Sequence, residues 1–419
     1  MMQEAVLIIG GSSLQISAIH AAHSLGLAAI ITDQLMTCPG TRFAEEFIPI
    51  STYDIEGHRR LIPQLQTRWG LRGVMCCGND VAPTVAACVE ELGTPGIPYE
   101  VACRTHDKAL VLGTLVDDTF DAYMPDWDPI YPHEQAPVAA VADFLRRYPQ
   151  GCVLKPIKQR ASRGVSIVHS EQEIDVAVRK VLEYSRLGDE FIVEELWTGT
   201  EHSAEVIFGA DGAPVFFNIV DRIFTYDGGA PIERGHVNPS RVGQPRWSQA
   251  FSLLKDVARA LGIMWGPFKA DLMLTDKGWK ILEVTARLSG GWDCQATTPL
   301  SSGRNPVRAV CSLACGLPVL AHDVEPSRRC YAACAAAFPK PGRVVALPDP
   351  DALRWLRGVP GVQRIEIGVR VGDLIEPYQH NAQRPAFVMA ISESYDAAWT
   401  LAEQGAQAVE AAIVTREVR

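Results

Sequence analysis

The sequence has no run of about 18 consecutive apolar residues, the length that a membrane-spanning helix requires. It opens with the short apolar run MMQEAVLIIGG, which lacks a preceding basic region and predicts a first β-strand rather than a signal peptide. Basic residues are the minority among the charges, with 39 Lys and Arg against 49 Asp and Glu, and the net charge of −10 argues against nucleic-acid binding. We therefore expect a cytoplasmic protein that binds neither membranes nor nucleic acids.

Two sequence signatures of functional sites are also missing. The chain contains no G-x-S-x-G motif around a serine, which argues against hydrolases built on a nucleophile elbow. Gly10 and Gly11 follow the first predicted strand and would let backbone N–H groups approach an anion, but the full G-x-G-x-x-G spacing is absent. A tight turn is at least as good an interpretation of these glycines as a dinucleotide site.

The cysteines do not have the pattern of a disulfide framework. Their number, eleven, is odd and their spacing is irregular, which indicates reduced thiols. Two C-x-x-x-C pairs, Cys311 with Cys315 and Cys330 with Cys334, raise the alternative of a zinc site. Both pairs lie in apolar segments without neighbouring histidines, so buried packing is the preferred interpretation.

The length of 419 residues is too great for one hydrophobic core, and we expect three domains. Residues 1–105 alternate strands, glycine turns and helices, as a doubly wound domain with a parallel sheet does. In the second domain, 106–320, the proline-rich stretch 122–137 predicts a connecting loop rather than a helix or a core strand. Residues 321–419 predict a small α+β domain, so the fold class is α/β and α+β.

The most informative segment is FKADLMLTDKGWKILEVTARLSGG at 268–291. Its period-two pattern predicts two half-buried strands joined by the tight turn TDKG. Asp271 and Glu283 interrupt the apolar runs, and Arg287 follows. Because buried carboxylates are costly unless positive charge neutralises them, we predict a cradle for a divalent metal and polyphosphate. The alternative is a solvent-facing hairpin with ordinary surface acids.

Two upstream segments point to a nucleotide. Lys155 ends the apolar strand CVLK, where phosphate is a natural partner for a buried ammonium, and the loop 159–164 has two arginines and small residues suited to closing over a triphosphate. In FIVEELWTGTE, Glu194 ends a strand and Glu201 begins the next. Backbone groups there could pair with adenine and a carboxylate with ribose hydroxyls, although an acidic hairpin turn fits that segment equally well.

The order of these segments resembles the ATP-grasp superfamily. The matching motifs are HDK at 106–108, LKP with its glycine-containing loop at 154–164, EELWTGTE at 194–201, Asp271, and E-x-x-x-R at 283–287. The resemblance covers roughly residues 105–315 and is particularly close to the carboxylate–amine ligases, such as L-amino-acid ligases, D-alanine–D-alanine ligases and purine-biosynthetic members. It implies an ATP-grasp fold between an N-terminal doubly wound domain and a small C-terminal α+β domain.

The resemblance also implies a role for each matching residue. Lys108, Lys155, Ser162 and Gly164 would hold ATP phosphates; Glu194, Glu195 and Trp197 would bind adenine and Glu201 the ribose; Asp271 and Glu283 would bind Mg²⁺ or Mn²⁺; and Arg287 would lie over the transferred phosphoryl group or the acyl intermediate. Thr285 replaces the family's usual asparagine, which predicts a weaker hold on a second metal ion. Lys269 stands where relatives often have arginine or another polar residue.

The activity that this resemblance implies is an ATP-dependent ligation of a small carboxylate and an amine. An acyl phosphate would form, the amine would displace phosphate, and ADP and phosphate would be released. The cofactors are then ATP and Mg²⁺ or Mn²⁺. The alternatives are an ATP-grasp carboxylase, a kinase-like phosphoryl transfer, and a non-catalytic nucleotide-binding regulatory protein.

The substrate residues are predicted from two polar segments. In the segment 221–241, Glu233, His236 and Arg241 are candidates, and His236 either accepts a proton from the amine or merely orders a loop. Arg241 or Arg287 would clamp a substrate carboxylate. The small residues Ser289, Gly290 and Gly291 permit close approach of the backbone to a substrate, although a turn would also require them. The C-terminal domain has no catalytic cluster, and we expect it to pack on the ATP site or to form a homodimer.

Overall fold

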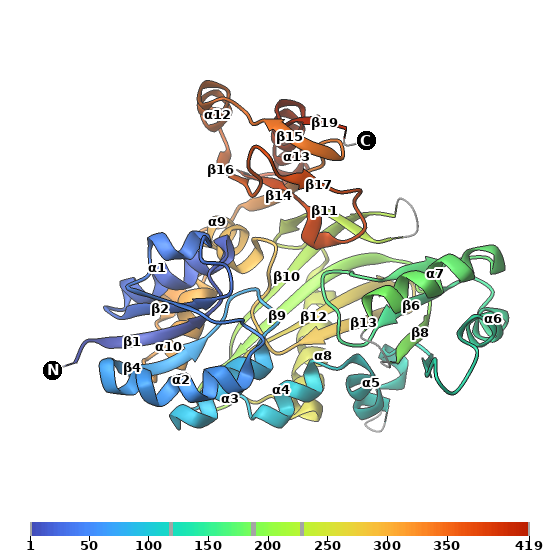
Figure 1. Cartoon of the computed structure of the whole chain (residues 1–419), viewed down its shortest axis with the longest axis horizontal. Coiled ribbons are helices and arrows are strands. Elements are labelled where there is room, and N and C mark those ends of the chain that lie inside the picture. The colour runs from blue at the N-terminus through green and yellow to red at the C-terminus, as the bar shows by residue number, and fades with distance from the viewer. Residues whose placement is uncertain (1, 117–119, 186–189, 227–229, 418–419) are drawn as a thin grey trace.

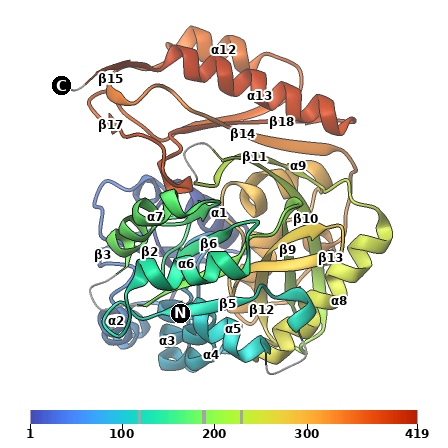
Figure 2. The same ribbon diagram turned by 90° about the vertical axis from the view of Figure 1, so that its right-hand side faces the viewer.

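The computed structural model describes residues 2–116, 120–185, 190–226 and 230–417. Figure 1 shows an N-terminal α/β part in blue, a central part with long strands, and a C-terminal part in orange and red that lies over the central strands. Figure 2 shows the C-terminal part again on one side of the other two. Within the four described ranges, no helix is both long and apolar enough to cross a bilayer.

The N-terminal part is a four-stranded parallel sheet with helices on both faces. Its elements are β1 (Glu4–Ile9), α1 (Ile16–Ser24), β2 (Ala28–Asp33), β3 (Glu46–Pro49), α2 (Ile55–Arg68), β4 (Gly70–Met75), α3 (Ala82–Leu92) and α4 (Tyr99–Thr105), with strand order β3-β2-β1-β4. Val6 and Ile8 pack in one core with α1, whereas Leu7 packs in another with α2 and α3. Alternate side chains of a strand point to opposite faces, and both faces are apolar here. The predicted doubly wound domain is confirmed.

A second, antiparallel sheet of four strands follows. Its elements are α5 (Lys108–Val116), β5 (Trp127–Ile130), α6 (Pro137–Arg147), β6 (Cys152–Pro156), β7 (Ser166–Val168), α7 (Glu171–Tyr184) and β8 (Phe191–Glu195), with strand order β5-β8-β6-β7. The apolar sides of α6 and α7 form its core together with β6 and β8. The prediction of a loop over 122–137 is wrong at 127–130. A strand with Pro129 is tolerated there because β5 is an edge strand, which needs fewer N–H donors.

The central sheet has eight strands and extends into the C-terminal part. Its order is β13-β12-β9-β10-β11-β14-β18-β16, and all the neighbours are antiparallel. The central elements are β9 (Thr200–Phe208), β10 (Pro214–Thr225), β11 (Ile232–Asn238), α8 (Gln244–Leu261), β12 (Gly266–Thr275), β13 (Gly278–Thr285), α9 (Thr298–Ser302) and α10 (Pro306–Ala314). Because β11 pairs with β14, the C-terminal part is joined to the central part by backbone hydrogen bonds as well as by the chain.

The C-terminal part packs helices on the last strands of this sheet and adds a small sheet of order β17-β15-β19. Its elements are α11 (Ala321–Val324), β14 (Tyr331–Ala337), β15 (Gly342–Ala346), α12 (Pro350–Arg357), β16 (Val362–Ile367), β17 (Leu374–Ile375), β18 (Ala386–Ser392), α13 (Tyr395–Ala412) and β19 (Val414–Arg416). A short turn at Asn381–Gln383 precedes β18. This turn reaches the central part of the molecule, as described below.

The predicted hairpin at 268–285 is confirmed as β12 and β13. Phe268, Ala270 and Leu272 are buried in a core with α8, so the intervening residues of β12 face the opposite side of the sheet. Asp271 lies on that opposite side and is paired in register with Glu283. The alternation of apolar and polar residues therefore places both acids on the face that the next section describes.

Candidate active site

A cavity of about 1830 Å³ opens between the three parts of the molecule. Its walls come from the loop after β4, from β6 and β8, from the exposed face of the β9–β13 strands, and from residues 381–387 of the C-terminal part. Most of the residues predicted for the site line it: Lys108, Lys155, Ser162, Glu194, Glu195, Trp197, Glu201, Glu233, His236, Asp271, Glu283, Arg287, Ser289, Gly290 and Gly291. Segments far apart in the sequence thus converge on one space.

Lys155 and Glu194 form an ion pair on the wall made by the four-stranded sheet. They lie on neighbouring strands β6 and β8, and both side chains are largely buried. Lys155 Nζ also lies 3.4 Å from the carbonyl oxygen of Leu282 on β13. Its ammonium therefore already has protein partners, in addition to the phosphate that the sequence predicts as a natural partner.

Lys108 and Glu283 form a second pair across the cavity. Lys108 Nζ lies 3.1 Å from Glu283 Oε1 and donates a hydrogen bond of 2.5 Å to the carbonyl oxygen of Gln159. Burial lowers the pKa of Lys108 to about 8 despite the attraction of Glu283. Burial alone would raise the pKa of Glu283, but the charges of Lys108 and Arg160 outweigh it and hold that pKa well below its usual range.

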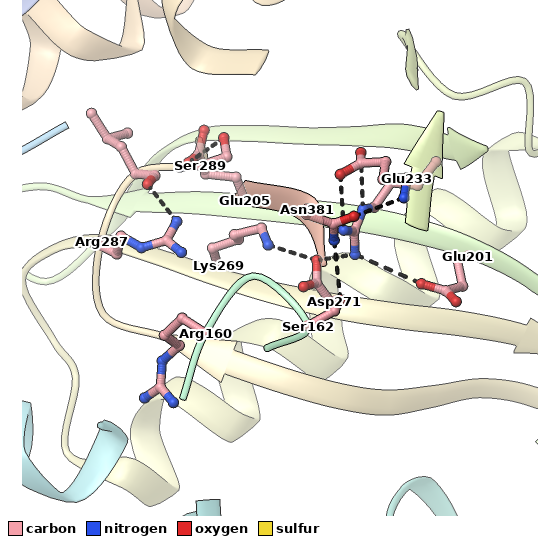
Figure 3. A network of polar contacts seen from close by, with 12 residues as sticks. Arg160, Ser162, Glu201, Glu205, Glu233, Lys269, Asp271, Arg287, Ser289 and Asn381 are labelled. Carbon is pink, nitrogen blue, oxygen red and sulfur yellow. Dashed lines mark hydrogen bonds and ion pairs between the residues drawn. The ribbon is translucent and has the colours of Figure 1, made fainter. Parts of the chain in front are cut away.

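Asp271 is held by two cations. Lys269 Nζ lies 2.6 Å from Asp271 Oδ1, and Arg222 Nη1 lies 3.1 Å from the same oxygen. Arg222 also pairs with Glu233 at 3.2 Å and with Glu201 at 3.7 Å, so one guanidinium neutralises acids from three other strands. Burial alone would lower the pKa of Arg222, but these carboxylates raise it. Figure 3 shows Lys269, Glu201 and Glu233 arranged around Asp271.

Arg287 is oriented by an aspartate of the N-terminal part. Its Nε and Nη2 both lie 2.7 Å from Oδ1 of Asp80, in the loop after β4. Arg160 Nε lies 3.9 Å from the same oxygen, and Arg160 Nη1 lies 3.6 Å from Glu283. The burial of Asp80 would raise its pKa, but Arg287 and Arg160 lower it below the usual value. Asp80 thus links the predicted phosphoryl-binding arginine to the 159–164 loop.

Glu233 and His236 lie on β11, at the side of the cavity nearest the C-terminal part. Glu233 pairs with Arg222 and with Arg384, which lies 3.4 Å away and comes from the segment before β18. Burial would raise the pKa of Glu233, but the two arginines lower it to about 2. His236 Nε2 lies 2.9 Å from the hydroxyl of Thr297, and burial lowers the pKa of this imidazole. A neutral histidine therefore faces the cavity at neutral pH.

The turn after Arg287 is fixed by hydrogen bonds and by close packing. Glu205 accepts hydrogen bonds from the backbone N–H of Ser289 at 2.5 Å and from its hydroxyl at 2.9 Å. Burial raises the pKa of Glu205 to about 7. A Cβ on Gly290 would lie 3.2 Å from the carbonyl oxygen of Gly78, so the glycine permits close contact with the N-terminal part. Gly291 has a positive φ of +66°, as a turn requires.

Backbone strain is concentrated at the cavity. Ala161, Ser162 and Trp292 are the non-glycine residues with positive φ in the described part of the chain, with values of 57°, 60° and 76°. All three line the cavity. Such conformations cost conformational energy and are typical of binding and catalytic sites, where the surroundings hold them in place.

Sequence comparisons agree with this architecture. Residues 148–296 match the family model of the ATP-grasp domain, residues 19–96 that of the ATP-grasp N-terminal domain, and residues 336–414 that of the L-amino acid ligase C-terminal domain 2. The chain belongs to the ATP-grasp superfamily. The prediction made from the order of the motifs is confirmed.

The curated proteins that this ATP-grasp chain matches are distant relatives. A D-alanine–D-alanine ligase of Geotalea uraniireducens (strain Rf4) is 30% identical over 169 residues, which is 39% of this chain and 52% of that protein. The chain spans about half the length of the curated relatives it matches. The crystal structure of an L-amino acid ligase from Bacillus licheniformis has a TM-score of 0.80 and 19% identity, and covers 99% of this chain and 100% of that one.

A second structural neighbour has a different activity. The ADP complex of an N5-carboxyaminoimidazole ribonucleotide synthetase has a TM-score of 0.73 at 16% identity, covering 97% of each chain. At these identities the two structures establish the fold of the ATP-grasp chain, and the chemistry has to be argued from its own residues.

The residues around β12 and β13 fit a divalent cation bound together with phosphates. Asp271 and Glu283 face each other across the hairpin, and the buried hydroxyl of Thr285 has no hydrogen-bond partner within the described residues. Those residues contain no group of three or more His, Cys, Asp or Glu that could enclose a metal on its own. Mg²⁺ characteristically uses one or two carboxylates and takes further oxygens from phosphates, which suits this open donor set.

Two predicted site residues, Gly164 and Arg241, do not line the cavity. Gly164 is needed for packing: its φ is +72°, and a Cβ there would lie 2.7 Å from both Pro156 and Tyr184. Arg241 follows β11 and is exposed; it lies 3.4 Å from Asp396, and its guanidinium lies 4.4 Å from the centre of the Tyr395 ring. Arg384, rather than Arg241, lines the cavity, where it lies 3.4 Å from Glu233. The segment predicted to line this side, 221–241, includes 227–229, which lie outside the described residues.

The residues predicted to bind adenine and ribose all line the cavity, but some of their polar groups already have partners within the protein. The backbone N–H of Glu195 donates to the carbonyl oxygen of Asp126, so that donor is already used within the fold. The ring of Trp197 lies 4.8 Å from Lys280 Nζ. Glu201 accepts a hydrogen bond of 3.1 Å from Tyr226, and burial raises its pKa. A ribose hydroxyl would have to share Glu201 with Tyr226 and Arg222.

Sequence reasoning missed four residues of the site: Asp80, Arg222, Asn381 and Arg384. Asp80 could have been predicted from the sequence. The segment GVMCCGND ends in polar residues at the carboxyl end of a parallel strand, where ligands bind in such sheets. Arg222 carried a weaker signal, as an arginine inside the apolar strand NIVDRIF. Asn381 and Arg384 carried none, since they belong to a polar turn that only the folded chain brings to the cavity.

Proposed function

We propose that this chain is an ATP-dependent ligase that activates the carboxylate of an amino acid as an acyl phosphate and couples it to an amine. The convergence of Lys108, Lys155, Asp271, Glu283 and Arg287 on one cavity carries the proposal. The match of residues 336–414 to the L-amino acid ligase C-terminal domain supports an amino acid as the substrate. ADP and phosphate are the other products.

The first step joins two anions, so it requires neutralised charge and alignment. A carboxylate oxygen attacks the γ-phosphorus of ATP, the bond to the β,γ-bridging oxygen breaks, and ADP leaves. Lys108 and Lys155 would hold the phosphates, and Arg287 would lie against the transferred phosphoryl group. Mg²⁺ or Mn²⁺ held by Asp271 and Glu283 would supply further positive charge to the phosphate oxygens.

In the second step an amine nitrogen attacks the acyl carbon, phosphate leaves, and the nitrogen loses a proton. His236 is the proton acceptor in this proposal, because burial lowers its pKa and keeps the imidazole neutral. The alternative role, ordering the turn through Thr297, needs only the hydrogen bond at 2.9 Å. His236→Gln decides between them: wild-type turnover in a folded variant would leave the ordering role alone.

The experiment that tests the function is a screen of phosphate release with ATP and Mg²⁺ over pairs of amino acids and other carboxylates, with a product mass for each active pair. The ligase proposal requires ADP formation that depends on an amine and a product whose mass equals both substrates minus water. ADP formation that depends on bicarbonate would indicate a carboxylase. A phosphorylated product would indicate a kinase, and tight ATP binding without turnover on any pair would indicate a regulatory protein.

A further inference from the structure

The turn Asn381–Gln383 belongs to the C-terminal part but lies in the cavity. Asn381 is buried, with 7% of its surface exposed, and it uses its backbone and both ends of its amide. Its N–H donates to the carbonyl oxygen of Ala161 at 2.9 Å, its Nδ2 donates to the hydroxyl of Ser162 at 3.1 Å, and its Oδ1 accepts from the N–H of Glu233 at 2.8 Å. Figure 3 shows Asn381 close to Ser162 and Glu233.

The two loop residues that Asn381 contacts are strained. Ala161 and Ser162 are consecutive and both have left-handed φ angles, although neither is a glycine. An isolated loop with these residues would leave this conformation, because L-residues with a Cβ disfavour it. Asn381 contacts both of these residues. It therefore stabilises the part of the 159–164 loop whose backbone conformation is unfavourable for its own residues.

The same turn holds the substrate side of the cavity. Arg384 donates from Nε to the carbonyl oxygen of Asn381 at 2.9 Å and from Nη1 to the carbonyl oxygen of Glu233 at 3.1 Å. Glu233 in turn pairs with Arg222, which pairs with Asp271. A continuous set of polar contacts therefore runs from the loop, through Asn381, to a predicted metal ligand.

We propose that Asn381 is a positioning residue that fixes the 159–164 loop in its nucleotide-binding conformation and ties that conformation to Glu233. The inference rests on the proposed function, since it takes the loop to cover the phosphates of ATP. It gives the C-terminal part a direct role at the nucleotide, beyond covering the cavity. Asn381 itself touches neither the reacting atoms nor the metal ligands in this proposal.

The test uses the full chain and the slowly hydrolysed nucleotide Mg-AMP-PNP. The variants are Asn381→Ala, Ser162→Ala and the double variant, and calorimetry gives the dissociation constant of each. Ser162→Ala removes one hydrogen bond of this contact and should weaken binding by about 3- to 10-fold, and Asn381→Ala, which removes the bonds to both Ser162 and Glu233, should weaken it at least as much. Ser162 is itself predicted to hold a phosphate, so the affinity of Ser162→Ala reports both roles. In hydrogen exchange without nucleotide, the loop of the double variant should exchange no faster than that of Asn381→Ala, because Ser162→Ala removes a contact that Asn381→Ala has already removed.

A second measurement separates positioning from general stability. Hydrogen exchange of peptides that cover 159–165 should be faster in Asn381→Ala than in the wild type, in the absence of nucleotide. Gln383→Ala is the matched control: it removes an amide of the same turn that bonds with Glu376 and with the backbone of Gln379, within the C-terminal part. It should leave nucleotide affinity and loop exchange unchanged.

Three results would overturn the inference. One is a folded Asn381→Ala variant with wild-type affinity and wild-type loop exchange. Another is a Gln383→Ala variant with the same defects as Asn381→Ala, because the effect would then come from the folding of the turn. If Asn381→Ala does not fold, Ser162→Ala alone decides, and wild-type behaviour there refutes the contact. Should the wild-type chain bind no nucleotide, the proposed function fails. Hydrogen exchange of the 159–165 peptides would then still test whether Asn381 holds the loop.

Discussion

Lys108 Nζ lies 3.1 Å from Glu283 Oε1, so a lysine at the start of α5 neutralises an acid near the end of β13. In the proposed function a phosphate would bind Lys108 and a divalent metal would bind Glu283. The same substitution of partners applies to Lys155, which is paired with Glu194. Binding of Mg-ATP would therefore exchange existing ion pairs for new ones, which avoids burying unpaired charges in the free protein.

The pKa of Lys108 predicts how nucleotide affinity depends on pH. Burial lowers this pKa to about 8, so the ammonium loses its charge as the pH rises through about 8. The dissociation constant of Mg-AMP-PNP should increase by about an order of magnitude between about pH 7.5 and about pH 9. Lys108→Arg stays charged and should remove this dependence; a Lys108→Arg profile parallel to the wild type would assign the effect to another group.

The effect of Lys108 on folding has the opposite sign. Its pKa is about 8 in the folded chain, below its usual value of 10.5, so between these values the unfolded chain binds more protons. The free energy of unfolding therefore gains a contribution from this group as the pH rises across that window. Urea titrations of the wild type and of Lys108→Met at several pH values would measure this rise in the free energy of unfolding. The rise should be smaller in the variant.

Glu283→Gln should abolish metal-dependent nucleotide binding and reduce turnover at least about 100-fold. The amide keeps the shape of the side chain but loses the charge that a cation and Lys108 require. Asp276→Asn is the matched control, since this exposed acid lies in the turn of the same hairpin. Near-normal turnover in Glu283→Gln would refute the assignment of this site.

The pair formed by Lys155 and Glu194 predicts a double-variant effect on stability. Lys155→Met should lower the free energy of unfolding by about 3 to 5 kcal/mol, because it leaves a buried carboxylate without its partner. Adding Glu194→Gln should recover part of that loss but should not recover nucleotide binding. Urea unfolding and calorimetry measure the two properties separately, and strictly additive losses of stability would contradict the pairing.

Arg222 and Arg241 offer a direct comparison of a buried and an exposed arginine. Arg222→Met removes a cation that Glu201, Glu233 and Asp271 share and should lower the free energy of unfolding by about 3 to 5 kcal/mol. Arg241→Ala should change it by less than about 1 kcal/mol and leave turnover intact. A large loss of turnover in Arg241→Ala would restore the substrate role predicted from the sequence.

Much of the central site could be predicted because its residues interrupt regular patterns. Asp271 and Glu283 stand out in apolar strands, and Lys155 ends one, so burial of a charge was readable from local sequence. The edge strand β5 was missed because its prolines favour a loop, and the pairing with β8 that overrides this preference is non-local. The sequence predicts that Gly164 helps to bind phosphate, and the structure adds that the packing of Pro156 and Tyr184 leaves no room for a Cβ there.

The sequence alone determined the α/β and α+β class, the hairpin at 268–285, and the order of motifs that places this chain in the ATP-grasp superfamily. The class and the hairpin depend on periodicity along the chain, and the superfamily on the resemblance of motifs in their order, so none of them needs knowledge of distant contacts. Tertiary structure decided which polar groups meet: Asp80 with Arg287, Arg222 with three acids, and Asn381 with Ser162 and the backbone of Glu233. The Arg222 contacts depend on how the strands of the central sheet pair, and the contacts of Asp80 and Asn381 depend on how the three parts pack around one cavity; neither is set by the local sequence.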